Sequence, residues 1–462
     1  MLVALFRPKR LDAPRRGTFV IKRVVPTLTG LGLLTLVLAV GGAGAPAGPA
    51  GHIIYVEGSS QKICQLTGEI DRQFHKPTVN RTASRFGMVG ADLGYSFEHH
   101  GKLFFIFGDA QPTPTFHGKP NGPADPPRMR DDNDAIAFTT DTVPGECPRL
   151  EFIRNSIGAY KNPVVLNAQG QPAITLATNE TPLSGISENV KMYVIFMTDN
   201  PIHFPKPPEP LGYSTRSVVG VSEDDGNTWH YLYDFSKGPG AKFVNVAIGR
   251  GEDGYLYFWG TQGGALYRKS AGFMARMRAE SIGRPDGAQS LEYLADVGAD
   301  GQPRFARSEA DAAPLFQDYG PGGSPSNCMG ELGVDWNRFV KRWIMLYNCL
   351  NNTPEHPRGI QMRVAEHPWG PWSEAQTIFN PVRDHGYCYF IHRAIDARNP
   401  QKCDDLAGPG LEGVWGGEYA PYFISRFTTG DEAQGTSTFY YTMATWIPYT
   451  QVVMRSTIRI SP

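Results

Sequence analysis

Residues 222–229 read SEDDGNTW, and this stretch decides the fold class. It fits Ser-x-Asp-x-Gly-x-Thr-Trp, the Asp-box hairpin pattern that is typical of β-propellers. Asp224 can accept hydrogen bonds from the backbone of the turn, Gly226 supplies a left-handed position, and Trp229 fills the apolar layer beneath. We therefore expect a structural hairpin here and assign no catalytic role to Asp224.

Short aromatic and β-branched runs recur along the rest of the chain, separated by loops rich in Gly, Pro, Asn and Asp. Strands at this density, with little room for crossover helices, predict an all-β protein, either a sandwich or a propeller. The clearest runs are 103–107, 135–138, 192–197, 217–221, 243–248, 254–259, 343–347, 360–365, 419–424, 437–444 and 452–460.

The Asp-box pattern favours the propeller over the sandwich. About 400 residues with long loops suit about five four-stranded blades. No linker calls for a second folded domain. We therefore predict a five-bladed β-propeller formed by one domain, residues 51–462.

The first 50 residues predict an export signal and not a part of the fold. A basic head is followed by the short apolar run 28–40 and by the small-residue segment 41–50. This order is that of a secretory signal peptide, and the apolar run is short for a membrane span. Because the basic head is long, an uncleaved N-terminal anchor stays open as the alternative. Either way, the protein is expected to be secreted or attached to the cell surface.

Charge and cysteine content narrow the class of protein further. The net charge is −1, which argues against a nucleic-acid partner whose phosphates must be neutralised. Six cysteines follow the leader, none of them in a CxxC pair, so disulfides are favoured over a zinc ribbon. Fifteen pairings exist for six cysteines, and chain order alone suggests Cys64–Cys147, Cys328–Cys349 and Cys388–Cys403.

The stretch 86–109, FGMVGADLGYSFEHHGKLFFIFGD, holds the strongest candidate site. Gly90–Gly94 is loop-like, 95–97 is a short strand, and 103–107 is a buried strand that Asp109 follows. Asp92 and Asp109 thus flank one hairpin and can converge on a polar cleft. The alternative for each aspartate alone is that it caps a turn.

Several pieces of the sequence, in this order, resemble glycoside hydrolase family 183, formerly the domain of unknown function numbered 4185. The resemblance runs over most of residues 85–460. It is carried by GADLG (90–94), GKLFFIFGD (101–109), DNDAIA (132–137), GELGVDWN (330–337) and YYTMATWIPYTQV (440–452). Ala91, Ala110 and the loop 383–410 depart from the family pattern, which leaves linkage and chain-length preference open.

This resemblance implies a five-bladed β-propeller that cleaves D-arabinofuranosyl linkages internally, in D-arabinan of mycobacterial arabinogalactan or lipoarabinomannan. The catalytic aspartate pair of the family matches Asp92 and Asp109. Cleavage of a glycosidic bond needs one group that protonates the leaving oxygen and another that attacks the anomeric carbon or activates water. We expect a retaining mechanism with Asp92 as the nucleophile and Asp109 as the acid/base.

Further polar and aromatic residues are candidates for substrate binding, each with a structural alternative. For the acids the alternative is a turn, a strand cap or a solvated side chain; for the arginines it is a structural salt bridge; for the aromatics it is blade packing. These candidates are Asp134, Glu188, Arg268, Glu331, Arg363, Glu418, Trp446 and Tyr449.

No cofactor and no metal site are predicted. His99 and His100 fall in a hairpin turn, where we expect them to be solvated, and no Cys/His cluster has zinc spacing. A structural Ca²⁺ or Na⁺ ion in the central channel is compatible with the sequence. We expect a monomer.

Two other functions compete with the hydrolase. One is a non-catalytic, lectin-like propeller that binds glycans, in which Asp92 and Asp109 would tolerate substitution. The other is a sialidase-like exo-glycosidase, suggested by the Asp box. Only one convincing box is present in the sequence, and neither an arginine cluster nor a tyrosine nucleophile can be assigned.

Overall fold

The chain is described from a computed structural model that covers residues 51–121, 133–177, 179–199, 216–262, 270–318, 327–349 and 359–461. The predicted leader, residues 1–50, lies outside these described residues. Residues Gly48–Pro462 form one compact unit. Within the described residues, no helix is both long enough and apolar enough to cross a membrane.

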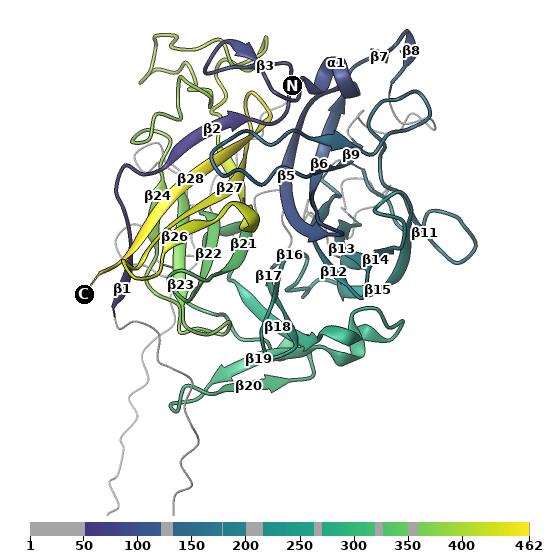
Figure 1. Cartoon of the computed structure of the whole chain (residues 1–462), viewed down its shortest axis with the longest axis vertical. Coiled ribbons are helices and arrows are strands. Elements are labelled where there is room, and N and C mark those ends of the chain that lie inside the picture. Colours follow the sequence, from purple (N-terminus) through teal and green to yellow (C-terminus); the bar gives the residue numbers. More distant parts are fainter. Residues whose placement is uncertain are drawn as a thin grey trace, which may run out of the picture. The chain divides into compact units, whose positions relative to one another are not determined.

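Five antiparallel sheets make up most of the structure (Figure 1). The first contains β5 (Met88–His99), β6 (Lys102–Pro112), β9 (Asn133–Thr139) and β10 (Glu151–Phe152). The second contains β12 (Pro182–Glu188), β13 (Lys191–Thr198), β14 (Arg216–Ser222) and β15 (Trp229–Lys237), with the short β11 (Val165–Leu166) added in parallel. The third contains β16 (Asn245–Arg250), β17 (Tyr255–Thr261), β18 (Phe273–Arg278), β19 (Glu292–Val297) and β20 (Pro303–Ala306).

The fourth sheet contains β21 (Met329–Asn337), β22 (Arg342–Cys349), β23 (Ile360–Ala365) and β24 (Gln376–Phe379). The fifth contains β25 (Glu418–Phe423), β26 (Thr429–Asp431), β27 (Thr436–Thr445) and β28 (Thr450–Ser461), together with β1 (His52–Tyr55) and β2 (Gln61–Gln65). Outside the sheets lie the pairs β3 (Ile70–Asp71) with β4 (Lys76–Pro77) and β7 (Thr115–Phe116) with β8 (Lys119–Pro120), and the short helix α1 (Thr82–Phe86).

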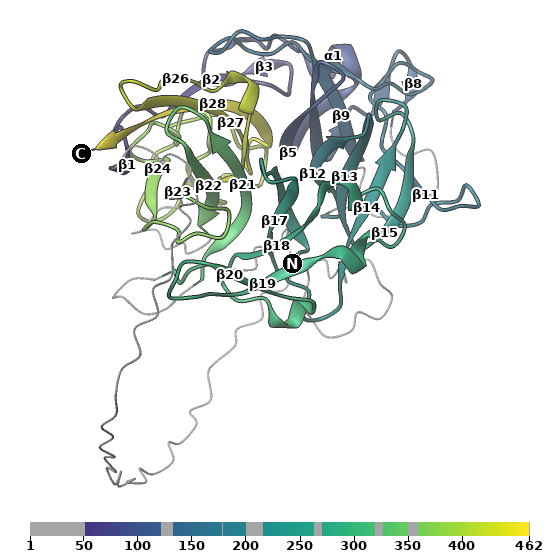
Figure 2. The same ribbon diagram turned by 60° about the horizontal axis from the view of Figure 1, so that its bottom comes forward.

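The five sheets are the blades of a β-propeller, as predicted. The first strand of each blade contacts the first strand of the next, in the order β5, β12, β16, β21 and β25, and β25 in turn contacts β5 (Figure 2). The ring is also closed by strand pairing within the last blade, because β1 and β2 from the start of the domain pair with the C-terminal β28. Both ends of the domain are thereby held in one sheet.

Blade-to-blade packing explains why the strands are rich in large apolar residues. The run Leu103–Phe107 of β6 is buried at every position, because neighbouring elements cover both of its faces. Phe97, Phe196 and Trp229 belong to one apolar cluster that joins the first blade to the second. The continuous apolar pattern was therefore a sound predictor of this strand.

The Asp-box hairpin forms between β14 and β15 as predicted. Oδ1 of Asp224 accepts the amide N–H of Thr228 at 2.8 Å, and Gly226 has a φ of 86°. The Trp229 side chain is fully buried and donates its indole N–H to the carbonyl of Gly226 at 3.0 Å. The role of this motif is structural.

The three disulfides suggested by chain order are present: Cys64–Cys147, Cys328–Cys349 and Cys388–Cys403. The first joins β2 of the last blade to the segment between β9 and β10 of the first blade. It thus reinforces the closure of the ring. No cysteine of the described chain is free.

Two local predictions within residues 86–109 were wrong. Gly90–Gly94 is not a loop but belongs to the continuous strand β5, where three register shifts against β6 absorb the irregular residues. Leu93 and Gly94 have φ angles of 61° and 82° there. Asp109 does not follow a strand either, because β6 continues to Pro112. Bulges of this kind re-aim side chains without ending a strand.

Candidate active site

Asp92 lies on β5 directly opposite Gly108 of β6. A side chain at this position would collide with three neighbours, of which Cδ1 of Leu93 is the nearest at 2.7 Å from a Cβ. A Cβ at position 108 would lie 2.9 Å from Oδ1 of Asp92 and 2.8 Å from Cγ2 of Thr181. The absence of a side chain at this position therefore leaves room for the Asp92 carboxylate within a tightly packed strand pair.

Asp109 follows this glycine and is held in an unusual backbone conformation. Its φ is 42°, in the left-handed region, and the pairing of β6 with β9 shifts register between Phe107 and Ala110. Both carboxylate oxygens of Asp109 accept the amide N–H of Asn179, at 3.0 and 3.1 Å. Backbone strain of this kind clusters at functional sites, where the surrounding structure maintains it.

Two tyrosine hydroxyls contact Asp92. Tyr419 from β25 donates to Oδ2 of Asp92 at 2.9 Å, and the hydroxyl of Tyr449 lies 3.0 Å from the same oxygen. The Tyr449 hydroxyl is also 3.2 Å from the backbone carbonyl oxygen of Asp109. One hydroxyl group from the last blade thus touches both aspartates of the first blade, so the two residues meet at one place.

Asp134 lies on β9 beside this pair. Its Oδ1 accepts the amide N–H of Asp109 at 3.1 Å. Burial raises the pKa of Asp134 well above its ordinary value, and the nearby carboxylates of Asp109, Asp92 and Glu180 raise it further. The Asp134 carboxyl is only 1% exposed. Asp134 thus places a third, buried carboxyl group beside Asp109.

Two predicted glutamates from other blades are also buried. Glu331 of β21 accepts a hydrogen bond from Nδ2 of Asn348 at 2.8 Å. Burial raises the pKa of Tyr422 well above its ordinary value, and Glu331 and Asp92 both add to this shift, so both carboxylates face the Tyr422 phenol. Glu418 begins β25, next to Tyr419, and is 1% exposed. Glu331 and Asp92 thus each lie near the Tyr422 phenol, and Glu418 precedes Tyr419, whose hydroxyl binds Asp92.

The structure does not bring Glu188 to this group. Glu188 ends β12 and forms an ion pair with Arg250 at the start of the turn between β16 and β17. It lies seven residues beyond Thr181, which is close to Gly108. At ~3.3 Å per strand residue this places Glu188 ~20 Å from the aspartates, at the opposite end of the blade.

Arg363 is part of a buried ion-pair network. Its guanidinium group donates to Oδ1 of Asp318 at 2.7 Å, to the hydroxyl of Tyr347 at 3.0 Å and to the carbonyl of Ser373 at 2.6 Å. The Phe316 ring covers it at 4.1 Å. The structural salt bridge that was the alternative for Arg363 is therefore what the structure contains. Arg268, the other predicted arginine, lies outside the described residues.

Of the two predicted aromatic residues, only Trp446 presents its ring to solvent. It is 39% exposed and meets the Tyr449 ring edge-on, with centroids 6.1 Å apart. Tyr449 uses its hydroxyl to bind Asp92, so it acts through a polar contact and not as a flat platform. The cis peptide bond between Ile447 and Pro448 precedes Tyr449, whose φ is 65°.

Sequence reasoning missed three residues of the site: Asn179, Glu180 and Tyr419. Glu180 is fully buried, and its Oε2 accepts the amide N–H of Ala177 at 3.0 Å. No local pattern marks these residues, because they reach the site from outside the first blade: Tyr419 comes from the last blade, and Asn179 and Glu180 come from the segment before β12. The signal that could have found Tyr419 is its position immediately after Glu418, in the inner strand of the last blade.

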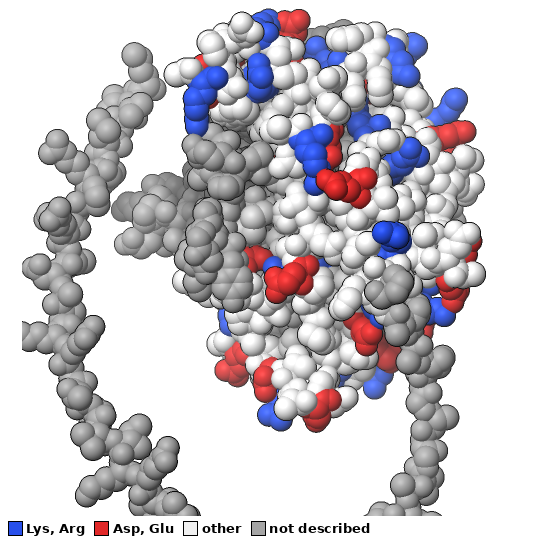
Figure 3. Space-filling model, turned by 90° about the vertical axis from the view of Figure 1, so that its left-hand side faces the viewer, with Lys and Arg blue, Asp and Glu red and all other residues white. Residues whose placement is uncertain are grey.

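Among the described residues, clusters of potential metal ligands occur at two places, and neither includes Asp92 or Asp109. The carboxylates of the site are instead held by hydroxyl and amide donors. On the molecular face drawn in Figure 3, acidic and basic side chains are interspersed among uncharged ones.

Comparison with known proteins identifies a family and a set of structures with a similar fold. Residues 78–455 match the family described as "Domain of unknown function (DUF4185)". No curated protein matches the sequence. A thermostable family-43 glycoside hydrolase is similar in structure, with 12% identity, 82% of this chain and 96% of that chain covered, and a TM-score of 0.42.

Two further solved structures are similar. An α-L-arabinofuranosidase from Podospora anserina has 9% identity, with 86% of this chain and 98% of that chain covered and a TM-score of 0.40. A glycosyl hydrolase from Bacteroides ovatus has 10% identity, with 88% and 93% covered and a TM-score of 0.39. Because these TM-scores lie below 0.5, any statement about chemistry depends on the residues of this chain.

Proposed function

Because the chain belongs to the family described as "Domain of unknown function (DUF4185)", we propose that it is an endo-acting glycoside hydrolase whose substrate is D-arabinan. The bond cleaved is a D-arabinofuranosyl linkage of the kind found in mycobacterial arabinogalactan and lipoarabinomannan. The substrate follows from the resemblance to glycoside hydrolase family 183. The chemistry follows from the arrangement of Asp92 and Asp109.

The observation that carries the proposal is that Asp92 and Asp109 lie on paired strands, with both carboxylates near the Asp134 carboxyl group and one tyrosine hydroxyl between the Asp92 side chain and the Asp109 backbone. Tyr449 lies 3.0 Å from Oδ2 of Asp92 and 3.2 Å from the backbone oxygen of Asp109. Two carboxyl groups close together, in different surroundings, can divide the acid and nucleophile roles of glycoside hydrolysis. A purely structural pair of aspartates would not need the strained backbone of Asp109 or the side-chain-free position 108.

Asp92 is the proposed nucleophile. The hydroxyls of Tyr419 and Tyr449 both donate to Oδ2 and so orient the carboxylate and stabilise its negative charge. In the first step, a carboxylate oxygen of Asp92 forms a bond to the anomeric carbon while the bond from that carbon to the leaving oxygen breaks. Asp109 supplies the proton that the leaving oxygen takes up.

Asp109 is the proposed acid/base. In the second step, Asp109 removes a proton from water, the water oxygen bonds to the anomeric carbon, and Asp92 is released as a carboxylate. The anomeric configuration is retained overall. Asp134 supports this role from behind, because its buried carboxyl group accepts the Asp109 amide N–H and so helps to hold the backbone of Asp109.

Substrate recognition is assigned to polar groups of other blades and to one exposed ring. Glu331 and Glu418 offer carboxylate oxygens to sugar hydroxyls, and Trp446 offers a ring face to a furanose. We propose no substrate contact for Glu188 or Arg363, since one lies at the far end of its blade and the other is buried in an ion-pair network. The predicted role of Arg268 stays a prediction.

The proposed location of the protein is outside the cell or on the cell surface. Three disulfides favour an oxidising compartment, and the leader pattern of residues 1–50 favours secretion or attachment to the cell surface. A monomer is the proposed state, with no nucleic-acid partner.

The experiment that tests the proposal is incubation of the purified protein with mycobacterial arabinogalactan. We expect a ladder of D-arabinose oligosaccharides, because an endo-acting enzyme cuts within the chain. The ¹H NMR spectrum recorded during cleavage should show the same anomer in the first product as in the substrate. A lectin-like propeller would bind the polysaccharide without releasing sugar, and an exo-acting enzyme would release monosaccharide from the first time point.

A further inference from the structure

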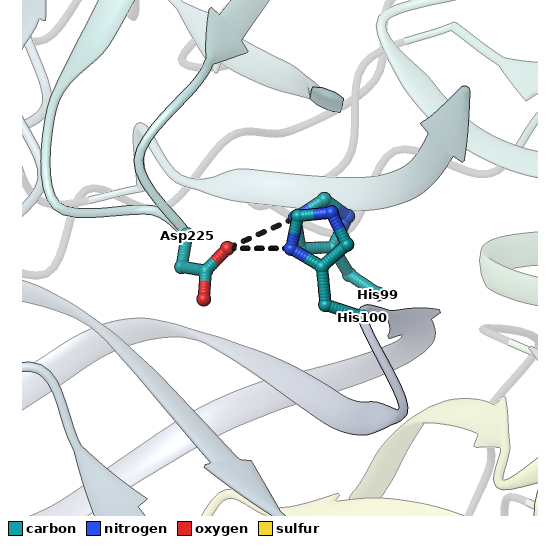
Figure 4. Close-up of side chains that lie close together, drawn as sticks. All are labelled: His99, His100 and Asp225. Atoms are coloured by element: carbon teal, nitrogen blue, oxygen red, sulfur yellow. Dashed lines mark hydrogen bonds and ion pairs between the residues drawn. The ribbon is translucent and has the colours of Figure 1, made fainter. Parts of the chain in front are cut away.

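His99, His100 and Asp225 form a side-chain cluster that the proposed function does not use (Figure 4). His99 is the last residue of β5, and His100 follows it in the turn to β6. Asp225 lies in the Asp-box turn between β14 and β15. The cluster therefore joins the hairpin turn of the first blade to a turn of the second blade.

The distances within the cluster suit a metal ion. Nε2 of His99 lies 3.2 Å from Oδ1 of Asp225, and Nδ1 of His100 lies 3.0 Å from the same oxygen. All three ligand atoms lie within 4.8 Å of one another. A tetrahedral Zn²⁺ site with bonds of ~2.0–2.1 Å requires its ligand atoms to be ~3.3 Å apart. Small side-chain rotations would bring the three atoms to these separations.

The surroundings of His99 prepare it to bind a metal. Its side chain is 1% exposed, so the prediction that His99 is solvated was wrong. Nδ1 of His99 is 2.8 Å from the hydroxyl oxygen of Ser187, a contact that fixes the ring and can leave the Nε2 lone pair directed at Asp225.

We propose that His99, His100 and Asp225 bind one Zn²⁺ ion, with water completing a four-coordinate site. Two imidazoles and one carboxylate select a transition metal over Ca²⁺ or Mg²⁺, which prefer oxygen ligands. Figure 4 shows both rings directed at the same carboxylate oxygen from one turn. The ion would clamp the first blade to the second and thereby stabilise the ring.

This site is separate from the proposed active site. His99 lies seven residues beyond Asp92 along β5, which at ~3.3 Å per residue is a distance of ~20 Å. The zinc ion is therefore a structural clamp and not a participant in cleavage. Its presence or absence is independent of whether the protein is a glycosidase.

Lys102 is a positively charged side chain next to the cluster that opposes the ion. Its Nζ lies 3.3 Å from Oδ2 of Asp225, the oxygen that the histidines do not contact, and 4.7 Å from the centre of the Phe138 ring. A lysine at this distance repels a cation and competes for the same carboxylate. Replacing Lys102 with an uncharged residue of similar length should therefore tighten zinc binding.

The test measures zinc binding and thermal unfolding of untagged full-length protein after removal of metal with EDTA. We expect one Zn²⁺ per chain by elemental analysis, and a Tm that rises with ZnCl₂ but not with CaCl₂ or MgCl₂. His100→Ala and Asp225→Asn should each weaken zinc binding at least ~10-fold and abolish the rise in Tm. Both residues are partly exposed, so both variants should fold.

Lys102→Met should bind zinc more tightly than the parent. His117→Ala, which removes an exposed histidine outside the cluster, is the matched control and should behave as the parent does. The proposal is overturned if the parent binds no zinc, or if His100→Ala and Asp225→Asn bind as much zinc with the same affinity. In either case the cluster would be an ordinary hydrogen-bonded group of two histidines and an aspartate.

Discussion

The hydroxyl group of Tyr449 lies 3.0 Å from Oδ2 of Asp92, across the junction between the last and the first blade. These residues are 357 positions apart in the sequence and meet only because the ring of blades closes. The same hydroxyl reaches the backbone oxygen of Asp109. The contact that closes the ring of blades therefore also assembles the proposed active site.

The first prediction concerns this hydroxyl group. Tyr449→Phe removes a donor to a charged oxygen and leaves the ring in place. A hydrogen bond to a charged group contributes ~1.5–3 kcal/mol, so kcat/KM on arabinogalactan should fall ~10- to 150-fold. Tyr231→Phe, which removes a hydroxyl bonded to Asp234 on an outer strand, is the control and should retain full activity. Equal activity of Tyr449→Phe and the parent would show that the hydroxyl does not orient Asp92.

The second prediction concerns Asp134 and pH. Its folded pKa is raised, whereas the unfolded chain ionises near the ordinary value of 3.8. Between these two pKa values the folded state holds more protons than the unfolded state, so stability falls as pH rises through this window. Asn resembles the protonated carboxyl and does not titrate. Asp134→Asn should therefore gain in Tm relative to the parent as pH is raised from 5 to 8.

Measurements of Tm at pH 5 and pH 8 test the direction of this change. The difference in Tm between Asp134→Asn and the parent is recorded at both pH values in the same buffer system. A difference that stays the same at pH 5 and pH 8 would mean that the pKa of Asp134 is not raised in the folded protein. The Asn side chain keeps the oxygen that accepts the Asp109 amide, so the backbone of Asp109 is preserved.

The third prediction separates structural from substrate-binding roles at Arg363. Breaking a buried ion pair by removing one partner costs ~3–5 kcal/mol, because the other charge stays buried. Arg363→Met should thus lower the free energy of unfolding by this amount while leaving the KM for arabinogalactan unchanged below the new Tm. Asp318→Asn should cause a similar loss, since it removes the opposite partner. A raised KM with unchanged stability would instead restore Arg363 to the substrate-binding residues.

The fourth prediction concerns the exposed ring of Trp446. Stacking of an aromatic ring contributes ~0.5–1.5 kcal/mol beyond area burial, so Trp446→Ala should raise KM ~2- to 12-fold with little change in kcat. Because the side chain is 39% exposed, the Tm should change little. Trp369→Ala, at a half-buried tryptophan near the turn after β23, is the control for loss of an indole. An unchanged KM in Trp446→Ala would remove the ring from the binding surface.

Much of the fold could be predicted from the sequence, because local sequence patterns mark the strands and turns of the blades. The apolar run Leu103–Phe107, the Asp-box residues around Asp224 and the order of the cysteines each depend on local chemistry. The segment Gly90–Gly94 was predicted to be a loop, because glycines and an aspartate are typical of loops. Only pairing with β6 turns these residues into a bulged strand.

The site was predictable in part. Asp92 and Asp109 lie on one hairpin, so their proximity follows from local pairing, although their catalytic role stays a prediction. Tyr419 and Glu180 were missed, because they come from the last and the second blade, which pack against the first from either side. The ion pair of Arg363 could not be predicted, because its partner Asp318 is 45 residues away. His99 was misassigned because its turn packs against the second blade.

Cleavage of arabinogalactan by Asp92→Asn and Asp109→Asn tests the central claim most directly, with Asp300→Asn in the turn between β19 and β20 as the matched control. The account predicts that each of the first two variants folds with the parent's Tm to within a few degrees and releases oligosaccharides at least ~100-fold more slowly, whereas Asp300→Asn cleaves as the parent does. Folded Asp92→Asn or Asp109→Asn protein that cleaves at the parent's rate, or a parent protein that releases no oligosaccharide, would contradict it.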